Sequence, residues 1–581
     1  MHCPFTRARA AWRSSDLPAA KQLHGKAVET KGTASGRCAA QLAMARKSLA
    51  NKLGPIHRKT LLQILIMAAM GVWIYWPALH GGWLWDDDLL ITDNSELRST
   101  QGLWQIWSTV PATDYWPLTW TLLWVEWHLW GNIPFGYHLC SLALHISSAL
   151  LIWRLLNRLG LRHGWLGGLL FVGHPLAVES VAWVSEIKNT LSLPLFLLSL
   201  DAWLDAEEKR PSGYLRSVFY YVAAMLAKTS TVMLPLVILL YCWWKRGRVT
   251  SQELRRLEPY FAIALLLGLV TILFQNIGQQ HSPFAFALGG FIPRLIDAGT
   301  ALLFYLEKFI LPINLLPLYP GLHLNRSTLL LEVMAISAIA GLLFYSWTRR
   351  GRWGRHVLFG FGFFLLNALP VIGLVKMQYM NVSLVADHLV YLPMIGLVGL
   401  IVAGLEDFPS LPYLGGVRTL SFVMMMAFLS KESHNHAMLF TDSETLWTYT
   451  LQHNPQTAKV HNNLGVALLQ TGRVPEAIEQ FKQALKIEPN NAYAHNILGN
   501  AFFQADHIPE AIEQFEQALK IKPKFAEAHN GLGVALLQTG HIPEAIEQFE
   551  LALKIEPDFA TALDNLVKAR ALLNSNISVG N

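Results

Sequence analysis

The chain has 581 residues, of which 52% are hydrophobic, 11% aromatic and only 15% charged. Soluble proteins carry about 25% charged residues, so this composition excludes an ordinary soluble enzyme and a disordered protein. The net charge of +6 does not indicate nucleic-acid binding, because the basic excess lies beside apolar segments, where it sets membrane topology.

Residues 1–59 are polar and basic, and they contain no apolar stretch long enough for a signal peptide. We expect them to form a basic cytoplasmic tail. Met44 opens a short basic lead-in to the first apolar segment. Translation can therefore begin at Met1 or at Met44. If it begins at Met44, residues 1–43 are not part of the protein.

Residues 60–430 are a succession of apolar runs close to the roughly 20 residues that cross a bilayer. They predict an all-α, polytopic membrane helix bundle of eleven spans with the N-terminus in the cytoplasm. The apolar segments 115–130 and 294–318 contain Pro, Trp and charges and are expected not to cross, which keeps basic clusters inside. The expected spans are 60–79, 135–155, 164–183, 190–206, 216–229, 231–245, 259–276, 328–348, 356–375, 389–405 and 413–430.

A 34-residue repeat follows, in which the segment PEAIEQF recurs at 475, 509 and 543. Its small and large residues resemble the tetratricopeptide pattern and predict an α-solenoid of three repeats over 458–559. We expect a connector with a half-repeat at 431–457 and a capping helix and tail at 560–581. One histidine recurs in each repeat, and packing is a better interpretation than metal binding for these side chains: His461, His495 and His529.

The first candidate for chemistry is GGWLWDDDLLITDN at 81–94, directly after the first expected span. A charged Asp at mid-bilayer costs about 2.5–3.5 kcal/mol, so Asp86, Asp87 and Asp88 are expected at the outer water boundary. One carboxylate can act as a general base, and its neighbour can hold the acceptor or a divalent cation. The alternative is a solvated acidic loop.

Two further polar clusters fall on the same expected outer face. The segment 173–192 contains His174, Glu179, Glu186 and Lys188, and the segment ADHLVYLP contains Asp387, His388 and Tyr391. We predict that the three clusters converge at one aqueous rim, with Asp86 and Asp87 close to His174. The alternative is that these side chains only anchor the helices at the interface.

The order of WDDD, YWPLTW at 115–120, FGYHL at 135–139, the segment 174–192, ADHLVYLP and terminal repeats resembles a group of bacterial tetratricopeptide-repeat membrane proteins. That group is similar to the animal transmembrane and tetratricopeptide-repeat O-mannosyltransferases. The resemblance implies a C-type glycosyltransferase that uses a lipid phosphosugar. It also implies that Asp86 is the base and Asp87 its partner in an inverting transfer of mannose from a polyprenyl phosphate to a hydroxyl.

The chain departs from its relatives at the positions expected to meet the donor phosphate. His388 stands where relatives have an Arg, which binds phosphate in a bidentate manner. Ile187 and Asn189 likewise replace an Arg and an Asp. Lys188 and Lys376 can supply positive charge instead.

The apolar runs predict a multi-pass membrane protein, and the resemblance implies a bacterial inner membrane and extracytoplasmic repeats that recruit a protein acceptor. The expected partners are membrane lipid, the polyprenyl-phosphate sugar and that acceptor, with no nucleic acid. Glu179, Glu186, Lys188, Asp387, His388, Tyr391 and His174 are the candidate donor-binding residues. The alternative is a non-catalytic membrane scaffold; a transporter fits less well, because the polar residues gather at one face and not at mid-membrane.

Overall fold

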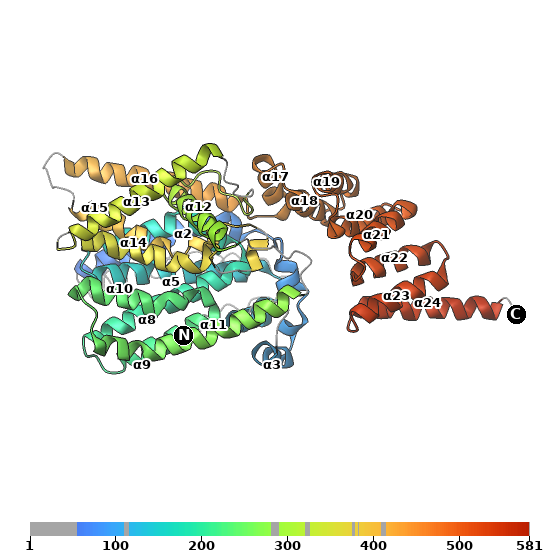
Figure 1. Ribbon diagram of the computed structural model, residues 1–581, viewed down its shortest axis with the longest axis horizontal. Helices are drawn as coiled ribbons and strands as arrows, with labels where there is room; N and C mark the ends of the chain where they lie inside the picture. The colour runs from blue at the N-terminus through green and yellow to red at the C-terminus, as the bar shows by residue number, and fades with distance from the viewer. Residues whose placement is uncertain are drawn as a thin grey trace, which may run out of the picture. The chain divides into compact units, whose positions relative to one another are not determined.

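The computed structural model describes residues 55–109, 115–280, 290–319, 326–351, 353–374, 378–381, 383–407 and 414–579. Within these residues every regular element is a helix, as predicted (Figure 1). The predictions about the N-terminal tail before residue 55, including a start at Met44, and about Lys376 lie outside the described residues.

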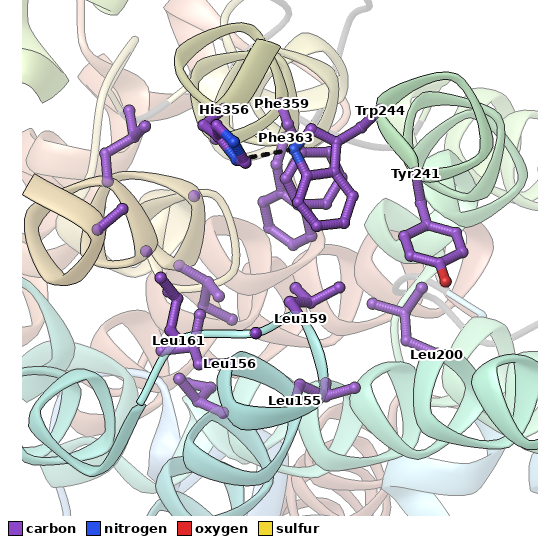
Figure 2. A pocket seen from close by; sticks show the side chains of 18 of the residues that line it. Leu155, Leu156, Leu159, Leu161, Leu200, Tyr241, Trp244, His356, Phe359 and Phe363 are labelled. Atoms are coloured by element: carbon purple, nitrogen blue, oxygen red, sulfur yellow. Dashed lines mark hydrogen bonds between the residues drawn. The ribbon is translucent and has the colours of Figure 1, made fainter. Parts of the chain in front are cut away.

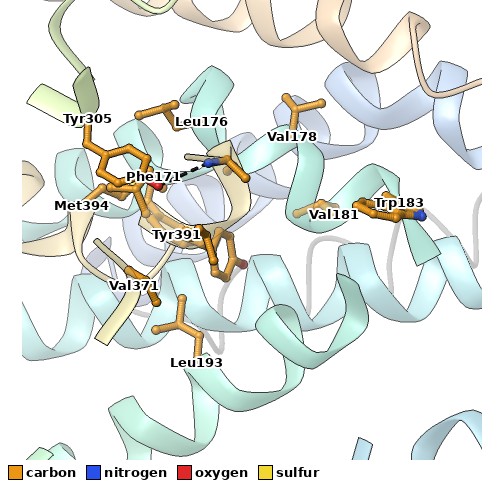
Figure 3. Close-up of a cluster of buried hydrophobic side chains, with 14 of the residues drawn as sticks. Phe171, Leu176, Val178, Val181, Trp183, Leu193, Tyr305, Val371, Tyr391 and Met394 are labelled. Carbon is orange, nitrogen blue, oxygen red and sulfur yellow. Dashed lines mark hydrogen bonds between the residues drawn. The ribbon is translucent and has the colours of Figure 1, made fainter. Parts of the chain in front are cut away.

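The membrane part is a bundle in which α5 packs against α6 and α8, and α8 packs closely against α9. Their buried side chains form a continuous apolar core, part of which Figure 3 shows around Phe171, Val181, Leu193 and Tyr391. The larger helices of this part are α2 (Pro55–Leu79), α4 (Pro117–Trp130), α5 (Pro134–Arg158), α6 (Gly164–Gly173), α8 (Ile187–Glu207), α9 (Gly213–Ala227), α10 (Leu234–Arg246), α11 (Ser251–Gln280), α12 (Phe291–Ile310), α13 (Arg326–Thr348), α14 (Gly354–Ala368), α15 (Met394–Asp407) and α16 (Leu414–Met438).

The expected number of eleven spans is not confirmed. Within the described residues five helices are long and apolar enough to cross a bilayer, or six if a pair bent by 64° counts as one span. The helices α9 and α10 have 15 and 13 residues and are too short to cross a bilayer. The helical structure is interrupted between them, beginning at Lys228. The candidate spans are Arg58–Leu79, Pro134–Arg158, Ser251–Phe274, Leu330–Thr348 and Gly354–Val371, and the bent pair is Gly164–Gly173 with Pro175–Ala182.

Two of the candidate spans expose most of their apolar side chains. Only 11% of the apolar window of Ser251–Phe274 and 6% of that of Leu330–Thr348 is buried inside the protein. Leu266 is 64% exposed and Phe344 is 71% exposed. A contiguous apolar surface of this kind is unfavourable in water. Helices of this length can bury it in the hydrocarbon core of a bilayer.

The C-terminal helices are stacked pairs whose contact points are set by the 34-residue repeat (Figure 1). In each pair a glycine of the first helix lies directly over a fully buried phenylalanine of the second: Gly465 over Phe481, Gly499 over Phe515 and Gly533 over Phe549. The helices are α17 (Ser443–His453), α18 (Ala458–Gln470), α19 (Val474–Ile487), α20 (Ala492–Gln504), α21 (Ile508–Ile521), α22 (Ala526–Gln538), α23 (Ile542–Ile555) and α24 (Ala560–Val579).

Gly499→Leu is expected to destabilise the packing of α20 against α21 in the middle repeat. A Cβ at Gly499 would lie 2.8 Å from the Phe515 ring, and the ring is fully buried and has no room to move aside. Overpacking of this kind costs about 1–3 kcal/mol. Hydrogen exchange should show faster amide exchange in α20 and α21, whereas Glu513→Leu, at an exposed position of α21, should leave these two helices protected.

The three repeated histidines make the same two hydrogen bonds in every repeat. His495 Nδ1 lies 2.8 Å from Gln514 Oε1, and its Nε2 lies 3.1 Å from the Pro489 carbonyl oxygen. His461 and His529 repeat this pattern with Gln480 and Gln548. Both ring nitrogens of each histidine are therefore hydrogen-bonded within the array. In each repeat the histidine links the two helices of the repeat to the proline that precedes them.

Candidate active site

The acidic segment after α2 forms a tight turn that points its carboxylates into the protein. The Asp87 amide donates to the Leu84 carbonyl at 2.8 Å, and the Leu84 amide donates to Asp87 Oδ2 at 2.9 Å. Trp85, between them, has a φ of 50°, in the left-handed region that bulky residues rarely adopt. Such strain persists only where the surroundings enforce it, and it is frequent at functional sites.

Two other tryptophans hold Trp85 in this conformation. Its ring stacks on Trp183 with centroids 5.1 Å apart, and it meets the Trp447 ring edge-on at 4.8 Å. The turn therefore packs between two segments: the loop that follows α7 (Val178–Ala182), and α17, the helix that directly precedes the repeats.

The two carboxylates of the predicted pair have different environments. Asp87 is fully buried, and its Oδ1 accepts hydrogen bonds from the amide of Ser185, at 2.9 Å, and from the Ser185 hydroxyl. Asp86 has a buried Oδ1 with no hydrogen-bond partner among the described residues. Asp87 therefore anchors the turn, and Asp86 carries the free oxygen.

Burial raises the pKa of both carboxyls. The pKa of Asp86 rises to about 6, because burial and Glu186 outweigh the opposing effect of Lys188. Burial and the neighbouring Asp86 raise the pKa of Asp87 to about 8, against the hydrogen bonds from Ser185 and Leu84. A base with a pKa near the working pH is well suited to proton transfer.

Glu186 joins the acidic turn to a group of cations. Lys188 Nζ lies 2.6 Å from Glu186 Oε1, and Lys228 donates to Asn189, which in turn donates to Glu186. Burial acts to raise the pKa of Glu186, but His388, Lys188 and Lys228 outweigh it and hold the pKa at about 2. Glu186 is thus a permanent anion at the centre of the cluster.

Glu179 and His388 close the cluster on its other side. The His388 amide donates to Glu179 Oε2 at 3.0 Å, and His388 Nδ1 lies 3.1 Å from Glu179 Oε1. His388 Nε2 lies 3.9 Å from Glu186 Oε1. His388 is therefore held between two carboxylates, so an imidazolium here would have its charge largely balanced by the protein.

Asp387 lies next to this pair in a layer of buried tyrosines. The Tyr319 hydroxyl donates to Asp387 Oδ1 at 2.9 Å, and His436 Nε2 lies 3.9 Å from Asp387 Oδ2. Burial and Glu179 raise the pKa of Asp387 well above its usual range. Tyr319 and His436 were not identified from the sequence.

Two predicted site residues make their polar contacts outside the carboxylate cluster. His174 stacks on Phe309, its Nε2 lies 3.0 Å from the Phe309 carbonyl oxygen, and its Nδ1 accepts from the Leu176 amide. The Tyr391 hydroxyl lies 2.8 Å from His145 Nδ1. The expected proximity of His174 to Asp86 and Asp87 is not seen in these hydrogen bonds and ring contacts, because His174 ends α6 on the side that faces α12.

Lys228 is a further site residue that the sequence analysis missed. It is 9% exposed, ends α9 inside an apolar stretch, and lines a small polar pocket together with Asn189, Ser192, His388 and Tyr391. An ionisable residue within an apolar segment is costly and therefore often functional. That signal was present in the segment AKTSTVMLP, which was treated as the junction of two spans.

A divalent cation, one of the two possibilities that the sequence left for the pair, does not fit the residues present. Three N–H and O–H donors already occupy most of the acceptor positions of Asp87, and the groups that contact its carboxylate are donors, which a cation would repel. Within the described parts of the chain, no group of three or more His, Cys, Asp or Glu side chains is placed to hold a metal ion.

The repeats contact the acidic turn directly. Asp88 Oδ2 accepts a hydrogen bond from Gln470 of α18 at 3.1 Å, and the Trp85 amide donates to the Ser443 hydroxyl of α17 at 3.4 Å. The Gly82 amide donates to the Thr441 carbonyl at 2.8 Å. The Gln470 contact places the end of α18, in the first repeat, beside the acidic turn.

The fold and the site together define a class: a helical protein with candidate membrane spans, a carboxylate pair in an acidic turn and a C-terminal tetratricopeptide array. The family models described as "TPR repeat" match residues 467–506 and 499–540, and the model described as "Tetratricopeptide repeat" matches residues 526–559. These matches confirm the predicted repeats. A solved structure of the first TPR domain of human RPAP3 has 22% identity, covers 22% of this chain and 98% of that chain, and has a TM-score of 0.21.

Among curated proteins the chain is similar to protein O-mannosyl-transferases. It is 23% identical to protein O-mannosyl-transferase Tmtc3 of Drosophila melanogaster, over 74% of this chain and 56% of that protein. It is 24% identical to protein O-mannosyl-transferase TMTC1 of Homo sapiens, over 73% of this chain and 54% of that protein. The predicted resemblance is confirmed, and the chain spans little more than half the length of these relatives.

Proposed function

We propose that the protein is a membrane glycosyltransferase that moves mannose from a polyprenyl phosphate to a hydroxyl of a protein acceptor. The similarity to proteins named protein O-mannosyl-transferases supports the reaction class. The observation that carries the proposal is the asymmetry of the carboxylate pair. Asp87 is fastened by Ser185 and Leu84, whereas Asp86 keeps a buried, unpartnered oxygen.

In the proposed step, Asp86 accepts the proton of the acceptor hydroxyl while the hydroxyl oxygen attacks the anomeric carbon of the donor. The bond from that carbon to the phosphate oxygen breaks, and the polyprenyl phosphate leaves with the bonding electrons. Attack from the face opposite the leaving group inverts the configuration. Lys188 and Lys228, beside Glu186, supply positive charge that favours the departing phosphate.

The repeats are proposed to recruit the acceptor, because α17 and α18 contact the acidic turn. We place the protein in a bacterial inner membrane with the carboxylate site and the array outside the cytoplasm. Protease added to intact spheroplasts should then cleave the array, whereas protection of the array would contradict this orientation.

The transfer rate is expected to rise with pH through about 6. Asp86 must be unprotonated to act as a base, and its pKa is raised to about 6, so the active form is lost below that value. The apparent pKa belongs to the Asp86–Asp87 pair, since the two carboxyls interact. A profile of kcat/KM between pH 4.5 and 8 checks this; a rate that is flat from pH 5 to 7 would contradict it.

Reconstituted protein, synthetic polyprenyl phosphomannose and candidate acceptors test the activity itself. Intact-mass measurement should show one hexose added to the acceptor with release of polyprenyl phosphate. If no acceptor gains a hexose while partner binding through the repeats persists, the protein is the non-catalytic scaffold that the sequence left as the alternative.

A further inference from the structure

A second cavity lies at the other end of the bundle from the carboxylates. It has a volume of about 310 Å³ and is enclosed by α5, α8, α10, α14 and α15. Figure 2 shows Trp244, His356 and Phe359 facing Leu159 and Leu161 across it. Nearly all of its lining is aliphatic or aromatic, so it suits an apolar ligand.

The cavity is distinct from the candidate active site. On α8, Asn189 belongs to the carboxylate cluster and Leu200 lines the cavity, which places them about 16 Å apart along the helix. On α14, Asn367 lines the polar pocket and Phe359 lines the cavity, about 12 Å away. The two sites therefore occupy opposite ends of shared helices.

Acidic and basic groups both lie at this end of the cavity, whose lining includes Glu406, and the Glu406 carboxylate lies 3.3 Å from His163 Nδ1. Several arginines at this end bind carboxylates: Arg158 pairs with Asp201, and Arg246 pairs with Glu207. Arg355 is different. It precedes the cavity residue His356, donates to the Trp244 carbonyl at 3.3 Å, and has no carboxylate within 4.0 Å among the described residues. Its Nε is buried without a hydrogen-bond partner.

We propose that this cavity binds one acyl chain of an anionic glycerophospholipid, with the headgroup phosphate beside Arg355. Two of the helices that line the cavity, α5 and α14, are candidate membrane spans, so a lipid chain is the apolar ligand within reach. An apolar cavity half this size binds benzene or xenon in preference to water. Anionic headgroups are attracted to basic residues at a membrane face.

The proposal is tested on the full-length protein purified in detergent, stripped of lipid and mixed with phosphatidylglycerol, phosphatidylcholine or polyprenyl phosphate. Native mass spectrometry measures the lipid retained. We expect one phosphatidylglycerol per protein, retained at least tenfold more than phosphatidylcholine. Equal retention of phosphatidylglycerol and phosphatidylcholine, or displacement of the bound phosphatidylglycerol by polyprenyl phosphate, would overturn the proposal; polyprenyl phosphate retained in addition to phosphatidylglycerol belongs to the proposed donor site.

Matched variants locate the lipid. Ala403→Trp places an indole in the cavity, whereas Gly404→Trp, one residue along α15, points to open space and is the control. Gly399→Leu is a second filling variant, because a Cβ there meets only Leu156, at 3.6 Å. Both filling variants should lower phosphatidylglycerol retention at least tenfold. Retention equal to that of Gly404→Trp in both would place the lipid elsewhere.

The headgroup contact is tested with Arg355→Gln against Arg350→Gln, an exposed arginine over the Trp347 ring. Arg355→Gln should abolish the preference for phosphatidylglycerol over phosphatidylcholine, and Arg350→Gln should keep it. The same preference in both variants would remove Arg355 from the site. These binding measurements do not depend on sugar transfer, so their failure would leave the proposed enzymatic function unaffected.

Discussion

Asp86→Asn is expected to lower kcat for sugar transfer by about 10²–10⁴-fold, the usual contribution of general base catalysis. The amide has the shape of the carboxylate but cannot take the acceptor's proton. Asp86 Oδ1 has no hydrogen-bond partner among the described residues, and an asparagine keeps one acceptor oxygen for the Ser185 side chain, so the substitution should preserve the fold. Initial rates with saturating donor measure the effect.

The neighbouring Asp88 provides the control. Its Oδ2 accepts a hydrogen bond from Gln470, and its side chain is half-buried. Asp88→Asn should leave kcat nearly unchanged, because the asparagine oxygen can still accept the hydrogen bond from Gln470 and this side chain is not part of the proposed proton transfer. Equal rates for Asp86→Asn and Asp88→Asn would show that Asp86 is not the base.

Asp87→Leu is expected to destabilise the membrane part of the protein. The substitution removes the acceptor of the Leu84 amide, the Ser185 amide and the Ser185 hydroxyl, all at a buried position. Each buried donor left unsatisfied costs about 1–3 kcal/mol, so the two amides alone cost about 2–6 kcal/mol. The thermal unfolding midpoint in detergent should fall by several degrees.

Substitutions of Asp86 and Asp87 should therefore differ in their effect on the unfolding temperature. Asp87→Asn keeps one acceptor oxygen and should unfold at a temperature between those of the wild type and Asp87→Leu. Asp86→Asn should unfold close to the wild type. An unfolding midpoint for Asp86→Asn below that of Asp87→Leu would contradict the assignment of Asp87 as the anchor.

The repeats could be predicted from the sequence because their contacts repeat with the period of the chain. Gly465, Gly499 and Gly533 recur at 34-residue spacing, and each makes room for a phenylalanine of its own repeat. Packing between sequence neighbours is local, so the pattern of small and large residues is enough to place the helices.

The membrane part was harder to predict, because hydropathy counts apolar residues and does not show where a helix breaks. Residues 213–246 are apolar enough for two spans, yet they fold as α9 and α10, which are both short, around Lys228. The segment 164–183 was likewise expected to form one span, but it folds as two helical pieces, α6 and Pro175–Ala182, whose axes differ in direction by 64°.

The candidate site was predicted in part. The sequence placed Asp86, Asp87, Glu186 and His388 at one end of the bundle, and their contacts join them through Ser185 and Lys188. His174 was expected in the same cluster but contacts Phe309. A topology specifies the end of a helix on which a residue lies, and tertiary packing decides the direction in which its side chain points. The roles of all these residues stay predictions.

The most direct test of the central claim is a single-turnover experiment in proteoliposomes with polyprenyl phosphomannose and an acceptor, comparing the wild type with Asp86→Asn and Asp88→Asn. We expect the wild type and Asp88→Asn to transfer mannose at similar rates, with inverted anomeric configuration, and Asp86→Asn to be slower by at least 10²-fold. Transfer by Asp86→Asn at the wild-type rate would contradict the account.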